Sequence, residues 1–230
     1  MRQWLEKQLH LKGPLPQDLK TIEILSYLLQ RGGMAYFRGL WARWQFKKCG
    51  SNLFVGRHCR FYFPGYISFG DQVQLGNDCS LNGLSKNGLR IGNRVHISEY
   101  SFIQATSQLD HPGEGIVIED DVYIGPHGYL GAGGGIYIGK GSMLGASLHL
   151  LAENHAFDNP DMPIQQQGVT RQGIRIGENV WIGNQVVILD GVTVGAGSVI
   201  GAGTVVTKSV LENSIVVGNP GRVIRQRKSK

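Results

Sequence analysis

The sequence predicts an all-β fold, a parallel β-helix built from six-residue repeats and preceded by a helical N-terminal extension. Three observations predict it. Aliphatic residues recur every six positions over most of the chain, and residues before about 48 lack this repeat. Glycine makes up 34 of the 230 residues, which is about twice its ordinary share. We therefore expect a helical extension (1–48), a β-helix domain (49–217) and a basic tail (218–230).

The six-residue repeat is clearest near the C-terminus, at Ile176, Ile182, Ile188, Val194, Ile200 and Val206. The same spacing recurs upstream at Phe69, Leu75 and Leu81, at Ile91, Ile97 and Ile103, at Ile118, Ile124 and Leu130, and at Ile138, Leu144 and Leu150. With 41% apolar residues, six consecutive hits in one register have a chance probability of roughly one in two hundred. A period of six fits a short strand plus a turn, with one aliphatic side chain per repeat pointing inward. Three repeats then form a triangular coil of about 18 residues, and the coils stack about 4.8 Å apart.

Small residues follow several of the aliphatic positions and suit the tight corners of a coil. Gly177, Gly183, Gly195 and Gly201 are of this kind. Glycine strings such as "GAGSVIGAG" also resemble phosphate-binding loops, but such loops join a strand to a helix, and the surrounding repeat offers no helix. The glycines therefore predict turns.

The N-terminal extension is expected to be helical. "TIEILSYLLQ" is an apolar helix candidate, and "MAYFRGLWARWQFKK" combines an apolar stripe with basic residues. The stripe consists of Met34, Phe37, Trp41 and Trp44, and the basic residues are Arg38, Arg43, Lys47 and Lys48. The favoured interpretation is a helix that packs on the first coil and covers its open edge. The alternative is a basic, tryptophan-rich face that makes peripheral contact with a membrane, and both can hold at once.

Charge and cysteine content restrict the partners and the compartment. The formal charge of +6 favours anionic partners. The C-terminal "GNPGRVIRQRKSK" is basic but lacks interleaved aromatic residues, so no nucleic acid is expected as a partner. Cys49, Cys59 and Cys79 lack any zinc-binding spacing and fit reduced thiols. Without a signal-peptide pattern, the protein is expected in the cytoplasm or at the inner face of the membrane.

The repeat is interrupted at residues 151–168, "LAENHAFDNPDMPIQQQG", and this interruption predicts an active-site loop at about 153–173. Functional residues concentrate in loops that a rigid scaffold holds. His155 lies at the base of the loop. Imidazole is largely neutral yet basic at cellular pH, which suits a general base, so His155 is the catalytic candidate. Glu153 and Asp158 are the nearest carboxylates that could orient it.

The stretch "IRIGENVWIGNQVVILDGVTVGAGSVIGAGTVVTKSV", followed by "IVVGNPGRVIR", resembles the left-handed β-helix acyltransferases of the hexapeptide-repeat superfamily. Within that superfamily the chain is similar to sugar O-acetyltransferases related to maltose and galactoside acetyltransferases, and to those that modify bacterial polysaccharides. The resemblance implies a left-handed coil, a homotrimer, and acetyl-CoA bound in the groove between adjacent β-helices. It implies no metal.

The resemblance also assigns roles to individual residues. His155 in "ENHAFD" falls at the position of the catalytic histidine, and Trp181 in "VWIG" matches a tryptophan that lines the active site. The residues implied along acetyl-CoA are Gly183, Gly201 and Ala202 beside the pantetheine arm, Thr207 and Lys208 near the phosphates, and Arg222 and Arg225 near the adenosine 3′-phosphate. Where maltose acetyltransferases carry an acceptor-binding asparagine, this chain has "YIGPHG", so His127 becomes a candidate for contact with the acceptor.

These features predict transfer of an acetyl group from acetyl-CoA to a sugar hydroxyl, in a bacterial polysaccharide or a lipid-linked saccharide. No cysteine occurs in the final coils, so direct transfer within a ternary complex is expected. The alternatives within the transferase class are N-acetylation of an amino sugar and O-acetylation of an antibiotic. Remoter alternatives are a γ-type carbonic anhydrase, with zinc held by His127, His149 and His155, and a non-catalytic β-helix scaffold.

Overall fold

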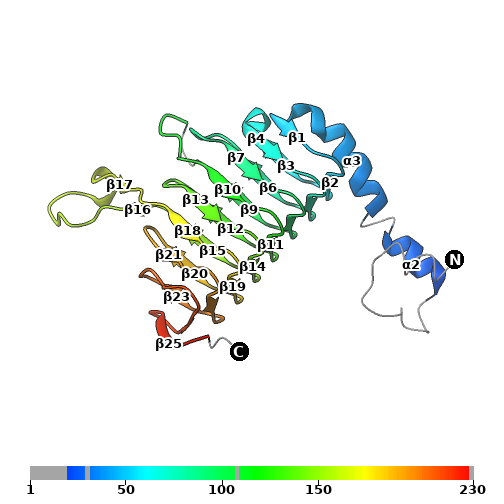
Figure 1. Ribbon diagram of the computed structural model, residues 1–230. Helices are drawn as coiled ribbons and strands as arrows, with labels where there is room; N and C mark the ends of the chain where they lie inside the picture. Colours follow the sequence, from blue (N-terminus) through cyan, green and yellow to red (C-terminus); the bar gives the residue numbers. More distant parts are fainter. Residues whose placement is uncertain (1–19, 29–31, 107–108, 228–230) are drawn as a thin grey trace.

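The computed structural model describes residues 20–28, 32–106 and 109–227, and in it the chain winds into a three-sided solenoid of parallel strands (Figure 1). Successive turns add strands to three sheets, A, B and C, in that order. Sheet A contains β1 (Lys48–Cys49), β4 (Ile67–Phe69), β7 (Leu89–Ile91), β10 (Ile116–Ile118), β13 (Ile136–Ile138), β18 (Ile174–Ile176) and β21 (Thr193–Val194). Sheet B contains β2 (Phe54–Val55), β5 (Gln74–Leu75), β8 (His96–Ile97), β11 (Tyr123–Ile124), β14 (Met143–Leu144), β19 (Trp181–Ile182), β22 (Val199–Ile200), β24 (Ser214–Val217) and β25 (Arg222–Gln226). Sheet C contains β3 (Arg60–Tyr62), β6 (Ser80–Asn82), β9 (Phe102–Gln104), β12 (Tyr129–Gly131), β15 (His149–Leu151), β20 (Val187–Leu189) and β23 (Val205–Val206).

The interior of the solenoid is filled mainly by aliphatic side chains. Most repeats contribute more than the one inward residue that the six-residue period predicts, since Val180 and Val186 are buried as well as Ile182 and Ile188. Every position that the repeat predicts to point inward, from Phe69 to Val206, is buried. Neighbouring coils hold these residues in register: Ile118 pairs with Ile138, and Ile138 pairs with Ile176. Similar side chains therefore stack along the axis, as the predicted parallel β-helix requires.

The corner glycines are required because the coils stack closely. A Cβ at Gly177 would lie 2.6 Å from the backbone nitrogen of Ala196 in the next coil, and one at Gly183 would lie 2.6 Å from that of Ala202. Neither glycine has a positive φ angle. Space between coils, and not backbone conformation, therefore selects glycine at these two corners.

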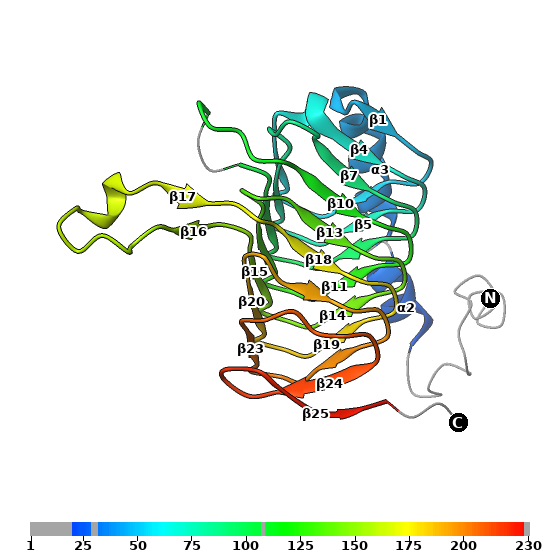
Figure 2. The same ribbon diagram turned by 60° about the vertical axis from the view of Figure 1, so that its left-hand side comes forward.

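The corner between sheets C and A carries the segments that interrupt the repeat, whereas the other two corners keep the same length from coil to coil. Residues 83–88 leave the solenoid here, as do 105–106 and 109–115. The longest excursion, 152–173, contains the antiparallel pair β16 (Asn154–His155) and β17 (Val169–Thr170) with a 3₁₀ turn (Ile164–Gln166). Figure 2 shows this hairpin extending well away from the coils. The segment predicted as the active-site loop forms this hairpin, and the excursions beside it were not predicted.

The N-terminal extension contains α2 (Thr21–Leu28) and α3 (Met34–Ala42), and α3 packs against β2. The contact uses small residues, since Ala35 and Gly39 are buried and a Cβ at Gly39 would collide with the backbone of Leu53. Arg38 fixes the helix further by donating from Nε to the carbonyl oxygen of Val55 at 2.7 Å. The helix therefore lies on the first coil, but through a face other than the apolar stripe noted in the sequence.

The apolar stripe of α3 faces solvent, and Trp41 and Trp44 are 86% and 88% exposed. No helix in the described part of the chain is long and apolar enough to cross a membrane. Peripheral membrane contact through α3 stays a prediction.

The basic C-terminal segment forms a strand. Residues Arg222–Gln226 form β25, which pairs antiparallel with β24 at the end of sheet B. Sequence analysis placed these residues in a tail, because a single strand that reverses direction carries no repeat to identify it.

Close stacking of the coils predicts that Gly177→Ala destabilises the fold. The added methyl would meet the backbone of the next coil, and overpacking of this kind costs about 1–3 kcal/mol. We expect the melting temperature, followed by circular dichroism, to fall by several degrees. Gly65→Ala is the matched control, because a Cβ there has no neighbouring atom within 4 Å; an equal loss of stability in both variants would contradict the explanation.

Candidate active site

His155 lies in the hairpin that leaves the solenoid between sheets C and A. Its backbone pairs with Val169 across the two short strands, and the Ala156 N–H donates to the carbonyl oxygen of Gly168 at 3.1 Å. The side chain of Gln167 closes the far part of the loop by donating to the carbonyl oxygens of Asn159 and Met162 at 2.8 and 2.7 Å. The imidazole is exposed, on a loop that its own hydrogen bonds hold in shape.

An ion pair anchors the base of the hairpin. Arg171 Nε donates to Glu153 Oε2 at 2.6 Å, and each side chain is only about one quarter exposed, 24% for Arg171 and 26% for Glu153. Arg171 also donates from Nη1 to the carbonyl oxygen of His111 at 3.3 Å, which ties the hairpin to the neighbouring excursion. The carboxylate of Glu153 packs against Gly133, where a Cβ would collide with it. These contacts fix the stem from which His155 projects.

Neither carboxylate suggested as a partner for His155 contacts it. Glu153 is occupied by Arg171, and Asp158 is exposed on the outer part of the loop. Within the described residues, no hydrogen bond joins the His155 ring to either carboxylate. Glu153 therefore acts on the site through the stem of the hairpin.

Trp181 lies on the outer surface of sheet B, between Met143 and Val199 of the adjacent strands, and its side chain is 58% exposed. The corner that follows it, between sheets B and C, contains Gly183, and one coil further lie Gly201 and Ala202. These three residues lie along the corner between sheets B and C in the C-terminal coils.

The glycine at position 183 does not supply a free backbone donor. Its N–H donates to the carbonyl oxygen of Ile200 at 2.8 Å, within the ladder that joins the coils. A different N–H is available nearby: that of Ala202 makes no hydrogen bond to the described residues. At the equivalent corner two coils earlier, the side chain of Asn184 accepts from the Ala146 N–H at 2.9 Å. The Gly183 N–H is therefore already used, whereas the Ala202 N–H is free among the described residues.

The basic residues expected near coenzyme A lie at the C-terminal end of the solenoid. Thr207 and Lys208 follow β23 and are exposed, and so is Arg222 at the start of β25. The Gly221 N–H donates to the carbonyl oxygen of Val205 at 2.8 Å, so Arg222 begins beside the strand that leads to Lys208. Arg225, also exposed, lies opposite Ile215 in the same strand pair.

His127 occupies the corner between sheets B and C in an earlier coil. It adopts a positive φ of 59° and stacks on Tyr100, with 5.0 Å between ring centroids and 8° between the ring planes. His149 lies on sheet C against Tyr129, and His155 lies in the hairpin. The three histidines named for zinc thus occupy separate parts of one chain, and the described residues contain no group of three or more metal-binding side chains.

One chain does not bring all the predicted site residues together. His155, Glu153 and Asp158 belong to the hairpin between sheets C and A, whereas Trp181 and Gly183 belong to sheet B and its far corner. Sheet C separates the two groups. Their roles stay predictions, and a site that uses both groups must draw on two neighbouring chains.

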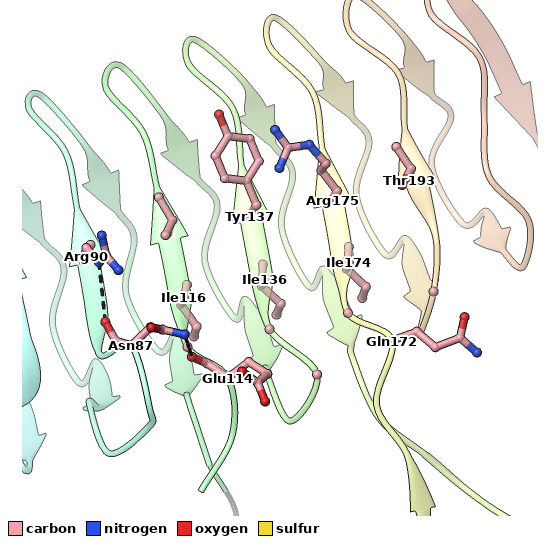
Figure 3. Close-up of a pocket in the computed structure, with 16 residues that line it drawn as sticks. Asn87, Arg90, Glu114, Ile116, Ile136, Tyr137, Gln172, Ile174, Arg175 and Thr193 are labelled. Atoms are coloured by element: carbon pink, nitrogen blue, oxygen red, sulfur yellow. Dashed lines mark hydrogen bonds between the residues drawn. The ribbon is translucent and has the colours of Figure 1, made fainter.

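A feature missed by sequence analysis is an open cavity of about 510 Å³ on the outer face of sheet A (Figure 3). Its lining includes the outward side chains Arg90 of β7, Tyr137 of β13, Arg175 of β18 and Thr193 of β21. Each of these four residues lies between two buried aliphatic residues in the sequence, which indicates an outward side chain. They were missed because outward positions do not repeat the same type of residue from coil to coil.

The comparisons with known proteins agree with this architecture. Residues 173–208 match the model of the family "Bacterial transferase hexapeptide (six repeats)". A probable acetyltransferase of Mycobacterium tuberculosis is 32% identical over 139 residues, which cover 60% of this chain and 44% of that protein. The chain thus spans less than half the length of that relative.

Solved structures of the N-acyltransferase AntD from Bacillus cereus share the fold. One AntD variant, in complex with dTDP-4-amino-4,6-dideoxyglucose and coenzyme A, is 24% identical, with a TM-score of 0.57 over 84% of this chain and 89% of that one. Another, in complex with dTDP and coenzyme A, is 25% identical, with a TM-score of 0.54 over 82% of this chain and 89% of that one. The predicted fold class is confirmed. The chain is a left-handed β-helix that carries the bacterial transferase hexapeptide at residues 173–208, and its predicted resemblance to the hexapeptide-repeat acyltransferases is confirmed.

Proposed function

We propose that this protein is an acetyl-CoA-dependent O-acetyltransferase that modifies a hydroxyl of a sugar in a bacterial polysaccharide or lipid-linked saccharide. The observation that carries the proposal is the anchored hairpin, which presents His155 beside a hexapeptide-repeat solenoid. The acetyltransferase name of the Mycobacterium tuberculosis relative and the coenzyme A bound to AntD support an acyl-CoA donor.

In the proposed reaction His155 acts as general base. Its imidazole accepts the proton of the sugar hydroxyl as that oxygen attacks the thioester carbonyl carbon. The carbon–sulfur bond then breaks, and the proton passes to the departing coenzyme A sulfur. A positioned base of this kind contributes about 10²–10⁴ in rate. The free N–H of Ala202 is the donor on the predicted coenzyme A edge that could bind the cofactor arm or the developing oxyanion.

The cysteines support direct transfer without a covalent acetyl-enzyme. All of them precede β6, in the first coils, whereas the hairpin follows β15. The hydrogen bond between Cys59 and Cys79 raises the pKa of the fully buried Cys79 thiol and lowers that of Cys59. It is therefore the separation of the thiols from the hairpin, and not their ionisation, that argues against a covalent acetyl-enzyme.

The surface chemistry of the three sheets supports a trimer. Sheet B exposes Tyr123, Met143 and Trp181, and sheet C exposes Phe102, which stacks on Tyr129 with 5.8 Å between ring centroids. Exposed apolar surface of this extent is typical of interfaces. If sheets B and C are covered by neighbouring chains, the hairpin of one chain reaches the sheet-B edge of the next, and His155 meets Trp181 across the interface.

N-acylation of an amino sugar is the second candidate. AntD is an N-acyltransferase whose structures contain a dTDP-linked 4-amino sugar. The same base and the same acyl donor can serve an amine, so the two candidates differ only in the acceptor atom.

Calorimetric titration of acetyl-CoA into the purified protein is the first test. We expect micromolar binding at one site per chain, without an acceptor. Replacing Lys208 and Arg222 together by alanine should weaken this binding about tenfold or more, because each charge-assisted hydrogen bond contributes about 1.5–3 kcal/mol. The same double variant should lose less affinity for dephospho-CoA than for acetyl-CoA. Arg57→Ala with Lys140→Ala removes the same charge from earlier coils and should leave binding unchanged; a folded protein that binds no acetyl-CoA would contradict the proposed function.

The second test separates the general base from a structural histidine. His155→Ala should abolish transfer and leave the melting temperature and acetyl-CoA affinity nearly unchanged, because the side chain is exposed and makes no hydrogen bond to the described residues. His58→Ala, an exposed histidine of the first coil, is the control and should retain activity. Turnover by His155→Ala near the wild-type rate would remove the assignment.

The third test asks whether the site is shared between chains. His155→Ala and Trp181→Ala chains should each be strongly impaired alone. When the two are co-expressed as mixed trimers, about a quarter of wild-type activity should return, because about a quarter of the interfaces then pair an intact His155 with an intact Trp181. Co-expression of His155→Ala with the double variant should recover none. Equal outcomes in the two mixtures would show that each chain holds its own site.

A further inference from the structure

The open cavity on sheet A, hereafter the sheet-A groove, has a lining suited to a ligand that is both polar and anionic. Figure 3 shows Arg90, Tyr137 and Arg175 projecting from β7, β13 and β18, with Asn87 and Gln172 at the end nearest the excursions. The groove crosses strands β7, β10, β13, β18 and β21. It is therefore long as well as broad, and it runs along the axis of the solenoid.

The two arginines of the groove, Arg90 and Arg175, form no ion pair within the described part of the chain. Arg90 has one weak contact, from Nε to the carbonyl oxygen of Asn87 at 3.4 Å. The acidic residue in the lining, Glu114, is already paired with Lys86 at 2.6 Å. Two guanidinium groups therefore remain available to an anionic ligand.

Tyr137 prearranges one of these cations. The guanidinium carbon of Arg175 lies 4.0 Å from the centroid of the Tyr137 ring, a cation–π contact that restrains the long arginine side chain. Glu119, the acidic residue beside the ring, accepts a hydrogen bond from the Tyr137 hydroxyl and, with partial burial, raises its pKa. The tyrosine thus stays neutral, and its hydroxyl engages the nearest carboxylate.

The spacing of the two arginines favours an extended ligand. Arg90 lies on β7 and Arg175 on β18, with β10 and β13 between them. Three steps between strands amount to about 14 Å between the backbones that carry them, so an extended ligand can place one anionic group at each guanidinium group. The amides of Asn87 and Gln172 and the hydroxyl of Thr193 add the donors and acceptors that sugar hydroxyls require.

We propose that the sheet-A groove binds the non-reacting part of an acidic saccharide chain, with Arg90 and Arg175 each holding an anionic group. The inference rests on the proposed function, because it makes this chain a continuation of the acceptor. Gln172 and Gly173, which line the groove, are also the last residues of the His155 hairpin. The groove and the hairpin are therefore continuous along the chain at this corner. Contacts remote from the reacting atoms position a substrate for reaction.

The test measures saccharide binding without any acetyl donor. The probe is a hexamer of galacturonic acid, titrated calorimetrically at low salt, with neutral maltohexaose as the comparison. We expect the acidic hexamer to bind and the neutral one to bind at least tenfold more weakly. Arg90→Gln with Arg175→Gln should weaken binding of the acidic hexamer by about tenfold or more, since charge-assisted hydrogen bonds are lost. Added salt should weaken it in the wild type.

Matched variants separate the groove from general charge. Arg57→Gln with Lys140→Gln lowers the net charge equally at corners outside the groove and should leave binding unchanged. Tyr137→Phe keeps the ring beneath Arg175 and should bind within about twofold of wild type, whereas Tyr137→Ala should bind several-fold more weakly. Equal losses in the two charge variants, or no binding of the acidic hexamer, would overturn the proposal.

A sugar nucleotide tests the alternative source of negative charge. If dTDP-glucose binds as tightly as the acidic hexamer and is lost in the same double arginine variant, the groove is a diphosphate site and the proposal of an extended saccharide fails. Acetyl-CoA titration of the double variant keeps the two hypotheses apart. The double variant should bind acetyl-CoA as tightly as the wild type if only the groove is impaired. If the wild type itself binds no acetyl-CoA, the proposed function is rejected, and the saccharide measurements still decide whether the groove binds an acidic chain.

Discussion

The fixed spacing between stacked parallel strands is the constraint on which the rest of this structure depends. Adjacent strands lie about 4.8 Å apart, so each coil must present its inward side chain directly against that of the next, as Ile138 does between Ile118 and Ile176. The same spacing leaves no room for a Cβ at corners such as Gly177. With the interior filled by aliphatic side chains, polar chemistry is confined to the outward faces, the corners and the segments that leave the coils.

This constraint explains why so much of the fold could be predicted from the sequence. Residues whose neighbours repeat along the axis must repeat in type, so one set of inward positions, from Phe69 to Val206, was identified from its period alone. A second buried set, which includes Val73 and Val180, was not identified. Outward residues do not have to match the residue type of the next coil. The charged lining around Arg90 and Arg175 was therefore missed. The strand Arg222–Gln226 was missed for a related reason: it reverses direction at the end of sheet B and has no following coil to impose a pattern on it.

The candidate site divides in the same way. His155 could be found because its loop breaks the period. Its stem could not, since Glu153 and Arg171 approach each other only once the two arms of the hairpin are antiparallel. Gly183 occupies its corner for a reason of packing. Its N–H belongs to the ladder between coils, and a Cβ at this position would meet the backbone of Ala202 in the next coil.

All the excursions leave the solenoid at the corner between sheets C and A and return to the next strand of sheet A. The length of an excursion is therefore independent of the register of the coils. Residues can be added or removed in the exposed parts of these excursions without changing the register of the inward side chains, because the chain re-enters at the next strand of sheet A. The solenoid thus separates the part of the sequence that must stay constant for folding from the part that can vary in recognition, and it keeps all the variable parts side by side along one edge.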